Sequence, residues 1–334
     1  MKCFTLQKEP TMTTAVRLAR TGCADVLEFI GQELSAPGPG EVLLEHDAIG
    51  VNYLDVTQRN GAVPIPLPSS LGLEGAGIVA AVGDGVEDVS VGDRVGYALG
   101  PLGAYADARL YPANRLLKLP EDLSSHDAAS LLLKGLTAQY LLTSTFPVGP
   151  GVTVLLYGAA GGLGAVMAPW AARLGAKVIG VVSRESSIER AKVGGCSDVV
   201  IWSNDLPDEI ARITQKRGVD VVYDGVGKTT FAASLECLRS RGTMVSIGAS
   251  SGVPDPVSVT TLNKKSLFLT RPSLAAHITD VAEYRERARD LFAAIAAGIV
   301  RPDIWKTYPL SQVAEAHRAL EGGQSRGAIT LDPR

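Results

Sequence analysis

Residues 152–164 read VTVLLYGAAGGLG, an apolar run that passes directly into a cluster of glycines. Near-continuous apolar runs of this length are typical of a strand whose two faces are both covered. Residues 162–174 then follow a helical pattern, and residues 177–182 form the next apolar run. The stretch therefore predicts a buried strand, a tight glycine turn, a helix and a second strand parallel to the first.

The same alternation continues to residue 270. It predicts strands at 152–157, 177–182, 198–202, 219–223, 243–247 and 266–270. The helices expected between them cover 162–174, 186–193, 207–215 and 229–238. Six strands with intervening helices indicate a doubly wound α/β domain of the Rossmann type with a six-stranded parallel sheet.

The first third of the chain has a different pattern, with strands expected at 41–50, 77–82, 94–99 and 105–110 between Gly/Pro turns. A helix is expected to begin at Ser124 or Ser125. After residue 280 the sequence predicts a helix ending near Ala297, a short helix at 311–320 and a last strand at 328–331. This tail is too small to stand alone, so we expect a mostly-β domain of 1–127 with 276–334, and a Rossmann domain of 128–275.

The 334 residues exceed the usual size of one core, in agreement with two domains. A net charge of −3 gives no electrostatic case for nucleic acid or an anionic membrane. The four cysteines are scattered without metal-ligand or disulfide-framework spacing, and no apolar run reaches the length of a membrane span. We expect a cytoplasmic protein in which residues 1–12 form a frayed extension.

The glycine cluster aligns with the G-x-G-x-x-G pattern at Ala159, Gly161 and Gly164, so the first glycine is missing. Its position between a buried strand and a helix is the context that a dinucleotide site needs. Gly161 would let the backbone approach a diphosphate, and Gly164 would let the helix pack closely. The free N–H groups at the start of the helix would bind the phosphates.

The end of the second strand indicates which dinucleotide is bound. NAD sites usually carry an acidic residue there, whereas NADP sites supply a cation. Here the strand is followed by Ser183 and Arg184, with Ser187 and Arg190 nearby, and guanidinium groups suit a 2′-phosphate. Glu185 keeps NAD open as the alternative, because a small backbone shift would place its carboxylate on the ribose.

Motifs spread over nearly the whole chain resemble the quinone oxidoreductase branch, which includes the ζ-crystallins, of the medium-chain dehydrogenase/reductase family. Apart from the glycine turn, they lie at residues 52–61, 71–79, 91–95, 102–105, 133–140, 221–227, 242–251 and 270–274. The resemblance implies that the mostly-β domain is a GroES-like catalytic domain. It also implies an NADPH-dependent enzyme that commonly forms homodimers.

The zinc-dependent alcohol dehydrogenases of that family hold catalytic zinc on Cys, on the His of a Gly-His-Glu motif, and on a further Cys or Asp. In this chain Leu73 stands at the His position before Glu74, and residues 50–55 contain no cysteine. Catalytic zinc needs three protein ligands, so no metal is expected and Glu74 is assigned a structural role. The four isolated histidines are likewise assigned to structure or surface: His46, His126, His277 and His317.

The resemblance also implies residue roles. Asn52, Tyr53 and Asp55 would lie beside the nicotinamide. Thr137 and Tyr140 would line its ribose and the diphosphate, and Gly162 and Leu163 would lie on the phosphates. Trp202 would stack near the adenine. The rest of the cofactor wall would comprise Val226, Gly248, Ser250, Ser251, Pro272, Ser273 and Leu274.

Three positions depart from the family pattern. Thr57 stands where the family often has Tyr, which would leave a wider or redirected pocket. Ser187 stands where Lys is frequent, so Arg184 or Arg190 must supply the cation. Gly323 replaces a cationic residue near the C-terminus, although Arg326 is close by in the sequence.

The expected reaction is hydride transfer from NADPH to a quinone without metal. Such a reaction develops negative charge on an oxygen of the acceptor, so hydrogen-bond donors must stabilise it. Asn52 is the first candidate because its amide donates without titrating near neutral pH. Tyr53, Thr57 and Arg59 are further candidates.

Two alternatives remain from the sequence. One is an NADPH-dependent reductase of an activated C=C bond, such as an enone or a 2-haloacrylate. The other is a crystallin-like or RNA-contacting protein that binds NADPH with little turnover, although the acidic charge argues against RNA.

Overall fold

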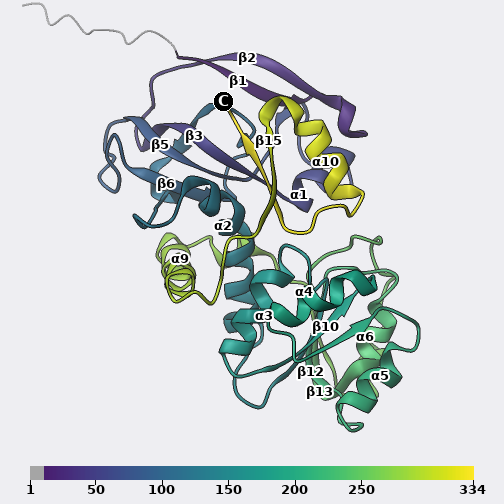
Figure 1. Ribbon diagram of the computed structural model, residues 1–334. Coiled ribbons are helices and arrows are strands. Elements are labelled where there is room, and N and C mark those ends of the chain that lie inside the picture. Colours follow the sequence, from purple (N-terminus) through teal and green to yellow (C-terminus); the bar gives the residue numbers. More distant parts are fainter. Residues whose placement is uncertain (1–10) are drawn as a thin grey trace, which may run out of the picture. The chain divides into compact units, whose positions relative to one another are not determined.

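The computed structural model describes residues 11–334, which divide into two units (Figure 1). One unit contains the chain up to Leu133 together with Pro302–Arg334, and the other contains Lys134–Arg301. The expected N-terminal extension lies outside the described residues up to residue 10, whereas Thr11 and Met12 already belong to a strand. None of the helices within residues 11–334 is both long and apolar enough to cross a membrane.

A six-stranded parallel sheet, as expected from the apolar runs, forms the centre of the second unit. Its strands are β9 (Thr153–Tyr157), β10 (Lys177–Val182), β11 (Asp198–Ile201), β12 (Val219–Asp224), β13 (Leu238–Ser246) and β14 (Phe268–Thr270). The spatial order is β11-β10-β9-β12-β13-β14, so the order of connection reverses beside β9. In sheets of this type, ligands bind beyond the carboxyl ends of the strands at this switch point.

Several helices accompany this sheet in the second unit. They are α2 (Ser125–Tyr140), which begins in the first unit, α3 (Gly164–Arg173), α4 (Ile188–Val193), α5 (Leu206–Ile213), α6 (Phe231–Cys237), α7 (Val259–Asn263), α8 (Leu274–His277) and α9 (Val281–Ala296). Helices α3 and α4 contact β10, while α5 and α6 lie side by side and pack on β11 and β12 (Figure 1). Alternate residues of β9 and β10, including Leu155 and Ile179, form one apolar core with Ile210 of α5 and Leu235 of α6. Burial of both sheet faces explains the uninterrupted apolar runs at residues 154–156 of β9 and 178–182 of β10.

Helix α9 packs within the second unit, although the predicted domain boundary at residue 275 placed it with the first. The ideal Cβ position of Gly135 would lie 2.4 Å from a methyl group of Leu291 on α9. The side chain of Arg287, also on α9, donates to Gln139 of α2 across 2.5 Å. These contacts explain why the chain returns to the first unit only at Pro302.

The first unit consists mainly of antiparallel strands. They are β1 (Thr11–Leu18), β2 (Leu27–Leu34), β3 (Glu41–Val51), β4 (Ser69–Ser70), β5 (Glu74–Val82), β6 (Arg94–Ala98), β7 (Ala108–Pro112), β8 (Leu117–Lys118), β15 (Ile304–Pro309) and β16 (Ala328–Asp332). Strands β2-β1-β4 form a small sheet, and the larger sheet has the order β15-β16-β3-β5-β6-β8 with β7 paired to β3. The C-terminal tail therefore completes the first domain, as the sequence indicated.

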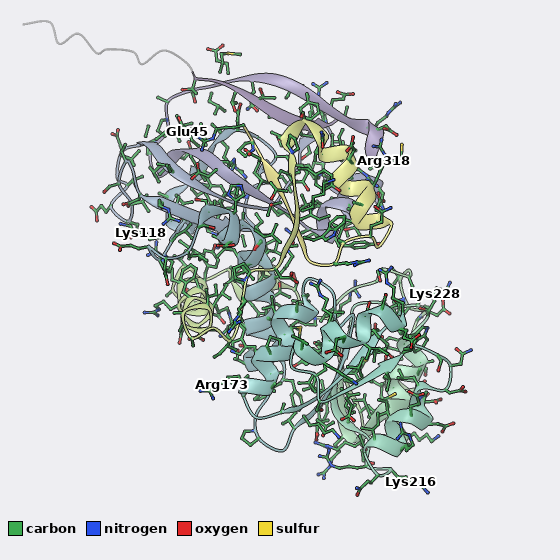
Figure 2. All side chains as sticks on the ribbon, viewed as in Figure 1. Glu45, Lys118, Arg173, Lys216, Lys228 and Arg318 are labelled. Atoms are coloured by element: carbon green, nitrogen blue, oxygen red, sulfur yellow. The ribbon has the colours of Figure 1, made fainter. Side chains whose placement is uncertain are left out.

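Two helices accompany these sheets: α1 (Tyr53–Asn60) and α10 (Val313–Glu321). They contact each other. Arg318, labelled in Figure 2, extends from the outer side of α10 and pairs with Asp25, whereas its neighbour His317 is completely buried. The two sides of α10 therefore differ sharply in exposure, and the side that carries Val313, Ala316 and His317 packs inward.

The predicted strand at 105–110 is wrong in its first half. Val16 donates its N–H to the Tyr105 carbonyl and Ala15 forms a bridge with Ala106, so this part of the chain is paired with β1. Regular pairing with β3 begins only at Ala108. The chain thus pairs with β1 of the small sheet at Tyr105 and Ala106, and with β3 of the large sheet from Ala108 onward. The pattern of apolar residues gives no sign of this switch between sheets.

Candidate functional site

The glycine turn between β9 and α3 closes as the sequence suggested, but a different glycine makes the sharp bend. Gly158 has a φ of 63°, a conformation that costs glycine little. A Cβ on Gly164 would lie 2.3 Å from the Gly158 carbonyl oxygen, and one on Gly161 would lie 3.1 Å from the same atom. Ala159 stands where the motif has its first glycine, and it is accommodated because Gly158 takes the strained position.

The turn presents backbone donors at the start of α3. Within residues 11–334, the N–H groups of Gly162, Leu163 and Gly164 have no hydrogen-bond acceptor, because the first bond of the helix runs from Ala165 to Gly161. These donors and the positive end of the helix dipole suit an anion. Lys134 of α2 lies beside the turn, since its Cε would be 3.3 Å from a Cβ on Gly162. The sequence motif at 133–140 contained Lys134, but only Thr137 and Tyr140 were singled out there.

The end of β10 lies next to the turn and exposes polar side chains. Ser183 and Arg184 are exposed, and Ser187 is the N-cap of α4. The N–H of Trp202, directly after β11, donates to the Val182 carbonyl across 2.8 Å. The predicted 2′-phosphate and adenine residues are therefore neighbours at one edge of the sheet.

The loop after β12 is organised by Asp224, a fully buried carboxylate. One carboxylate oxygen accepts the N–H groups of Val226 and Gly227 at 2.8 and 3.0 Å. The other accepts the hydroxyls of Thr230 and Ser234 at 2.7 and 2.9 Å. Four charge-assisted bonds fix the loop, so Asp224 serves structure. The sequence motif at 221–227 contained it, but no local signal separated its role from ligand binding.

The loop after β13 packs on the same region. A Cβ on Gly248 would lie 2.7 Å from the Gly225 carbonyl oxygen, so only glycine fits this approach. The N–H of Ser250 donates to the Gly225 carbonyl, and the Ser251 hydroxyl donates to the Val226 carbonyl. The predicted wall residues in the loops after β12 and β13 are thus held together by hydrogen bonds to backbone carbonyls.

The segment after β14 lies beside the loop that follows β13. Arg271 donates to the Ser246 hydroxyl at the end of β13 across 3.0 Å. Pro272 follows, and Ser273 and Leu274 begin α8. Nearly all predicted cofactor residues of this unit therefore lie beyond the carboxyl ends of its six strands.

Thr137 and Tyr140 are the exceptions, because they lie on α2. Tyr140 is buried and stacks on His277, with ring centroids 4.3 Å apart. Burial raises the pKa of Tyr140 to about 12. Its predicted contact with a ligand stays a prediction.

In the first unit, Asn52 is the N-cap of α1 and forms a capping box with Asp55. The backbone N–H of Asn52 donates to Asp55 Oδ2 across 2.8 Å, and its side-chain amide donates to Glu74 Oε2 across 2.8 Å. The other oxygen of Glu74 accepts the Leu133 N–H across 2.7 Å. The spacing Asn-x-x-Asp is a helix-start signature, and it could have predicted α1 from the sequence.

The other candidates on α1 have different environments. Tyr53 has 41% of its surface exposed, and the Thr57 hydroxyl donates to the Leu54 carbonyl across 2.8 Å. Arg59 is only 1% exposed and binds both carboxylate oxygens of Glu321, at 2.9 and 2.5 Å. This guanidinium is engaged in an ion pair, and its predicted role as an oxyanion donor stays a prediction.

Two of the four histidines are deeply buried. His46 Nδ1 lies 2.8 Å from the Ala106 carbonyl oxygen and its Nε2 lies 2.9 Å from the Tyr97 hydroxyl. Burial, together with nearby Arg109, lowers the pKa of His46 to about 3. Burial, together with Arg59, also lowers the pKa of His317 to about 3. Both imidazoles are therefore neutral in the folded protein near neutral pH.

The free energy of unfolding is expected to fall as the pH is lowered from 7.5 to 5.5. In the unfolded chain both imidazoles have a pKa near 6.5 and take up protons in this range, whereas the folded chain does not. Because the unfolded state then binds more protons, stability is lost by about 2–3 kcal/mol. Urea unfolding at the two pH values measures the difference. A curve that is flat over this range would show that neither imidazole is held neutral.

The described residues do not fit a metal ion. No group of three or more His, Cys, Asp or Glu side chains within residues 11–334 has an arrangement that could hold one. The position of a zinc-binding His is occupied by Leu73, which is buried at 5% exposure just before β5. Glu74 is engaged with Asn52 and Leu133.

Comparison with known proteins agrees with this geometry. Residues 38–121 match the family described as alcohol dehydrogenase GroES-like domain, and residues 195–331 match the one described as zinc-binding dehydrogenase. The chain is 40% identical to quinone oxidoreductase 1 of Escherichia coli, over 96% of this chain and all of that protein. It belongs to the quinone oxidoreductase branch of the medium-chain dehydrogenase/reductase family. The predicted fold, a GroES-like domain with a Rossmann domain, is thereby confirmed.

One further relative and one solved structure bear on the chemistry of this family member. The chain is 44% identical to a 2-haloacrylate reductase of a Burkholderia species, over 97% of this chain and 100% of the reductase. The crystal structure of Escherichia coli quinone oxidoreductase complexed with NADPH superposes with a TM-score of 0.93, at 40% identity, covering 96% of this chain and 100% of that one.

Proposed function

We propose that this protein is an NADPH-dependent quinone oxidoreductase that transfers hydride to a quinone without a metal ion. The observation that carries this function is the glycine turn at the switch point of the parallel sheet, where three N–H groups at the start of α3 have no acceptor within residues 11–334. Full-length similarity to quinone oxidoreductases, one of them crystallised with NADPH, supports the same assignment.

The second unit supplies the groups that would hold NADPH. The backbone of Gly161, Gly162 and Leu163 would receive the diphosphate, and the ammonium group of Lys134 would add a positive charge beside it. Ser183, Arg184 and Ser187 would meet the 2′-phosphate, with Trp202 next to the adenine. The remaining wall would consist of Thr137, Tyr140, Val226, Gly248, Ser250, Ser251, Pro272, Ser273 and Leu274.

The coenzyme supplies a hydride when it is bound. The task of the chain is to orient the acceptor and to stabilise the negative charge that develops on its oxygen. We assign that stabilisation to the side-chain amide of Asn52, which Glu74 and the capping box hold in one orientation. Tyr53 and Thr57 are secondary candidates for the same stabilising role. Asp55 would hold Asn52 in place through its backbone N–H and would not contact the substrate.

Independence from zinc is supported by the residues at the ligand positions of the zinc-dependent relatives. Leu73 offers no donor atom, and Asn52 and Glu74 are bonded to each other. Activity is therefore expected to be unchanged by a strong chelator.

Reduction of a 2-haloacrylate is the second candidate, because the chain is 44% identical to a 2-haloacrylate reductase. Hydride would then be added to the β-carbon, and a proton to the carbon that bears the halogen. The developing negative charge would be spread over an enolate oxygen, so Asn52 would have the same role.

Parallel assays of NADPH oxidation with 1,4-benzoquinone, an enone and 2-chloroacrylate distinguish these functions. We expect the quinone to be the preferred acceptor. Preference for 2-chloroacrylate would establish the second candidate instead. Tight NADPH binding with no turnover of any acceptor would indicate a binding protein and contradict both.

A homodimer is part of the proposed function. Strand β14 is the last strand of the parallel sheet, and its Phe268 and Leu269 are 63% and 37% exposed. Edge strands with exposed apolar side chains favour pairing with another chain. Two copies would join through β14.

Replacing Phe268 by Asp is expected to convert the dimer to a monomer, because a buried, unpaired carboxylate would disfavour the interface. Sedimentation velocity measures the change. Val193→Asp is the matched control, since Val193 is 81% exposed on α4 and remote from β14 in the sheet order. A Phe268→Asp variant that stays dimeric would place the interface elsewhere.

A cytoplasmic location is supported by the cysteines. Cys23, Cys196 and Cys237 are all free thiols. Burial raises the pKa of Cys196 and of Cys237 to about 12, so these two are inert as nucleophiles. A chain without disulfides among its described residues fits a reducing compartment.

A further inference from the structure

An ion pair between the buried Arg59 and the partly exposed Glu321 joins α1 to the last helix. The guanidinium of Arg59 binds Glu321 through both terminal nitrogens, and its Nη1 also lies 3.4 Å from Nδ1 of His317. His317 is 0% exposed. Residues 258 positions apart in the sequence thus meet in the interior of the first unit.

The ion pair continues into a chain of hydrogen bonds. His317 Nε2 lies 2.9 Å from the Tyr105 hydroxyl, which donates to Asp55 Oδ2 across 2.9 Å. The same carboxylate oxygen accepts the backbone N–H of Asn52. Tyr105 and Asp55 are both 0% exposed, so water does not compete with these bonds.

The donors in this chain have one consistent order. A guanidinium can only donate, so Nδ1 of His317 accepts and the imidazole proton is on Nε2. Nε2–H then donates to the Tyr105 oxygen, which leaves the tyrosine proton for Asp55. Burial raises the pKa of Tyr105 and lowers that of His317, so neither group changes its protonation near neutral pH.

The order of donors has a consequence for Asn52. Asp55 is the partner of Asn52 in the capping box, and its position depends on the hydroxyl that binds it. The Asn52 amide is therefore oriented from two sides, by Glu74 on its side chain and by Asp55 on its backbone. A small displacement of a reacting or stabilising group is costly to catalysis.

We propose that His317 is a positioning residue for the reaction: through Tyr105 and Asp55 it sets the orientation of the Asn52 amide. This role rests on the proposed function, in which Asn52 stabilises the negative charge on the acceptor oxygen. His317 touches neither substrate nor coenzyme in this role, and its contribution is to turnover rather than to coenzyme affinity.

Two substitutions of His317 test the role. His317→Phe keeps the ring but removes both nitrogens, and kcat is expected to fall on the order of tenfold while the KM for NADPH is unchanged. His317→Gln restores an acceptor for Arg59 and a donor for Tyr105, so most of the lost kcat is expected to return. A change in melting temperature with unchanged kcat in His317→Phe would mean that the residue only stabilises the fold.

Tyr105→Phe is a milder variant that covers the case in which His317→Phe fails to fold. It removes only the hydroxyl that connects His317 to Asp55, and the same fall in kcat is expected. Tyr97→Phe is the matched control, because Tyr97 is equally buried but its hydroxyl bonds His46 and Arg109. Equal kcat values for Tyr105→Phe and Tyr97→Phe would overturn the inference.

The test separates this inference from the proposed function. If Asn52→Ser leaves kcat unchanged, the assignment of Asn52 itself is wrong. If Asn52→Ser lowers kcat but His317→Phe and Tyr105→Phe do not, the positioning role is wrong and the proposed function stands.

Discussion

Replacing Gly164 by Ala is expected to weaken NADPH binding on the order of 100-fold, which corresponds to the loss of one or two charge-assisted hydrogen bonds. The new Cβ would lie 2.3 Å from the Gly158 carbonyl oxygen and 2.7 Å from the Cα of Ala159. Both are backbone atoms that no rotamer change can move. The turn must open, and its N–H groups then lose their common direction.

Isothermal titration with NADPH measures this effect, with circular dichroism to show that the variant is folded. Gly149→Ala is the matched control, since a Cβ on Gly149 meets no atom within 4 Å. Equal affinity of Gly164→Ala and the parent protein would mean that the coenzyme does not use this turn.

Replacing Asn52 by Ala is expected to lower kcat about 100-fold, the usual effect of losing one oxyanion donor. NADPH affinity should change by about twofold or less, because the coenzyme's phosphates are assigned to the second unit. Steady-state kinetics together with a direct binding titration separates the two quantities.

Asn52 also caps α1, so its loss alone removes about 1 kcal/mol of stability. Asn52→Ser retains a good cap but is too short to replace the amide, and it should therefore keep stability while losing turnover. Asn60→Ser, at the exposed end of the same helix, is the control. If Asn52→Ser retained full turnover, Asn52 would have no part in the reaction.

The second unit was largely predictable because its signals are local. The strand predicted at 177–182 coincides with β10, since a buried parallel strand requires an uninterrupted apolar run. Strand β13 was expected to begin at 243 but begins at Leu238. Its early part pairs irregularly with β12, and Arg241 has a φ of 61°, so no regular pattern marks it.

The first unit was less predictable because its pairings join distant parts of the chain. Strand β3 pairs with β5, β7 and β16. The sequence predicted that the C-terminal tail returns to this domain, but it predicted none of these pairings. Helix α1 has a capping box but no clear apolar stripe. Its residues therefore matched a family motif, but no helix was predicted there. Propensity is a weak guide when packing decides the conformation.

In the candidate site, too, features with a local sequence signal were predicted and contacts between distant residues were not. The glycine turn and the residues after the strands were found because each follows a recognisable strand. Tyr105 and His317 were missed as members of one network because 212 positions separate them. Lys134 was missed because its proximity to Gly162 results from the packing of α2, which a sequence pattern does not record.

A crystal structure of the protein grown with NADPH tests the central claim most directly. We expect oxygens of the coenzyme's diphosphate within hydrogen-bond distance of the backbone nitrogens of Gly162 and Leu163. Bound NADPH whose diphosphate lies elsewhere, with those nitrogens facing only solvent, would contradict the account.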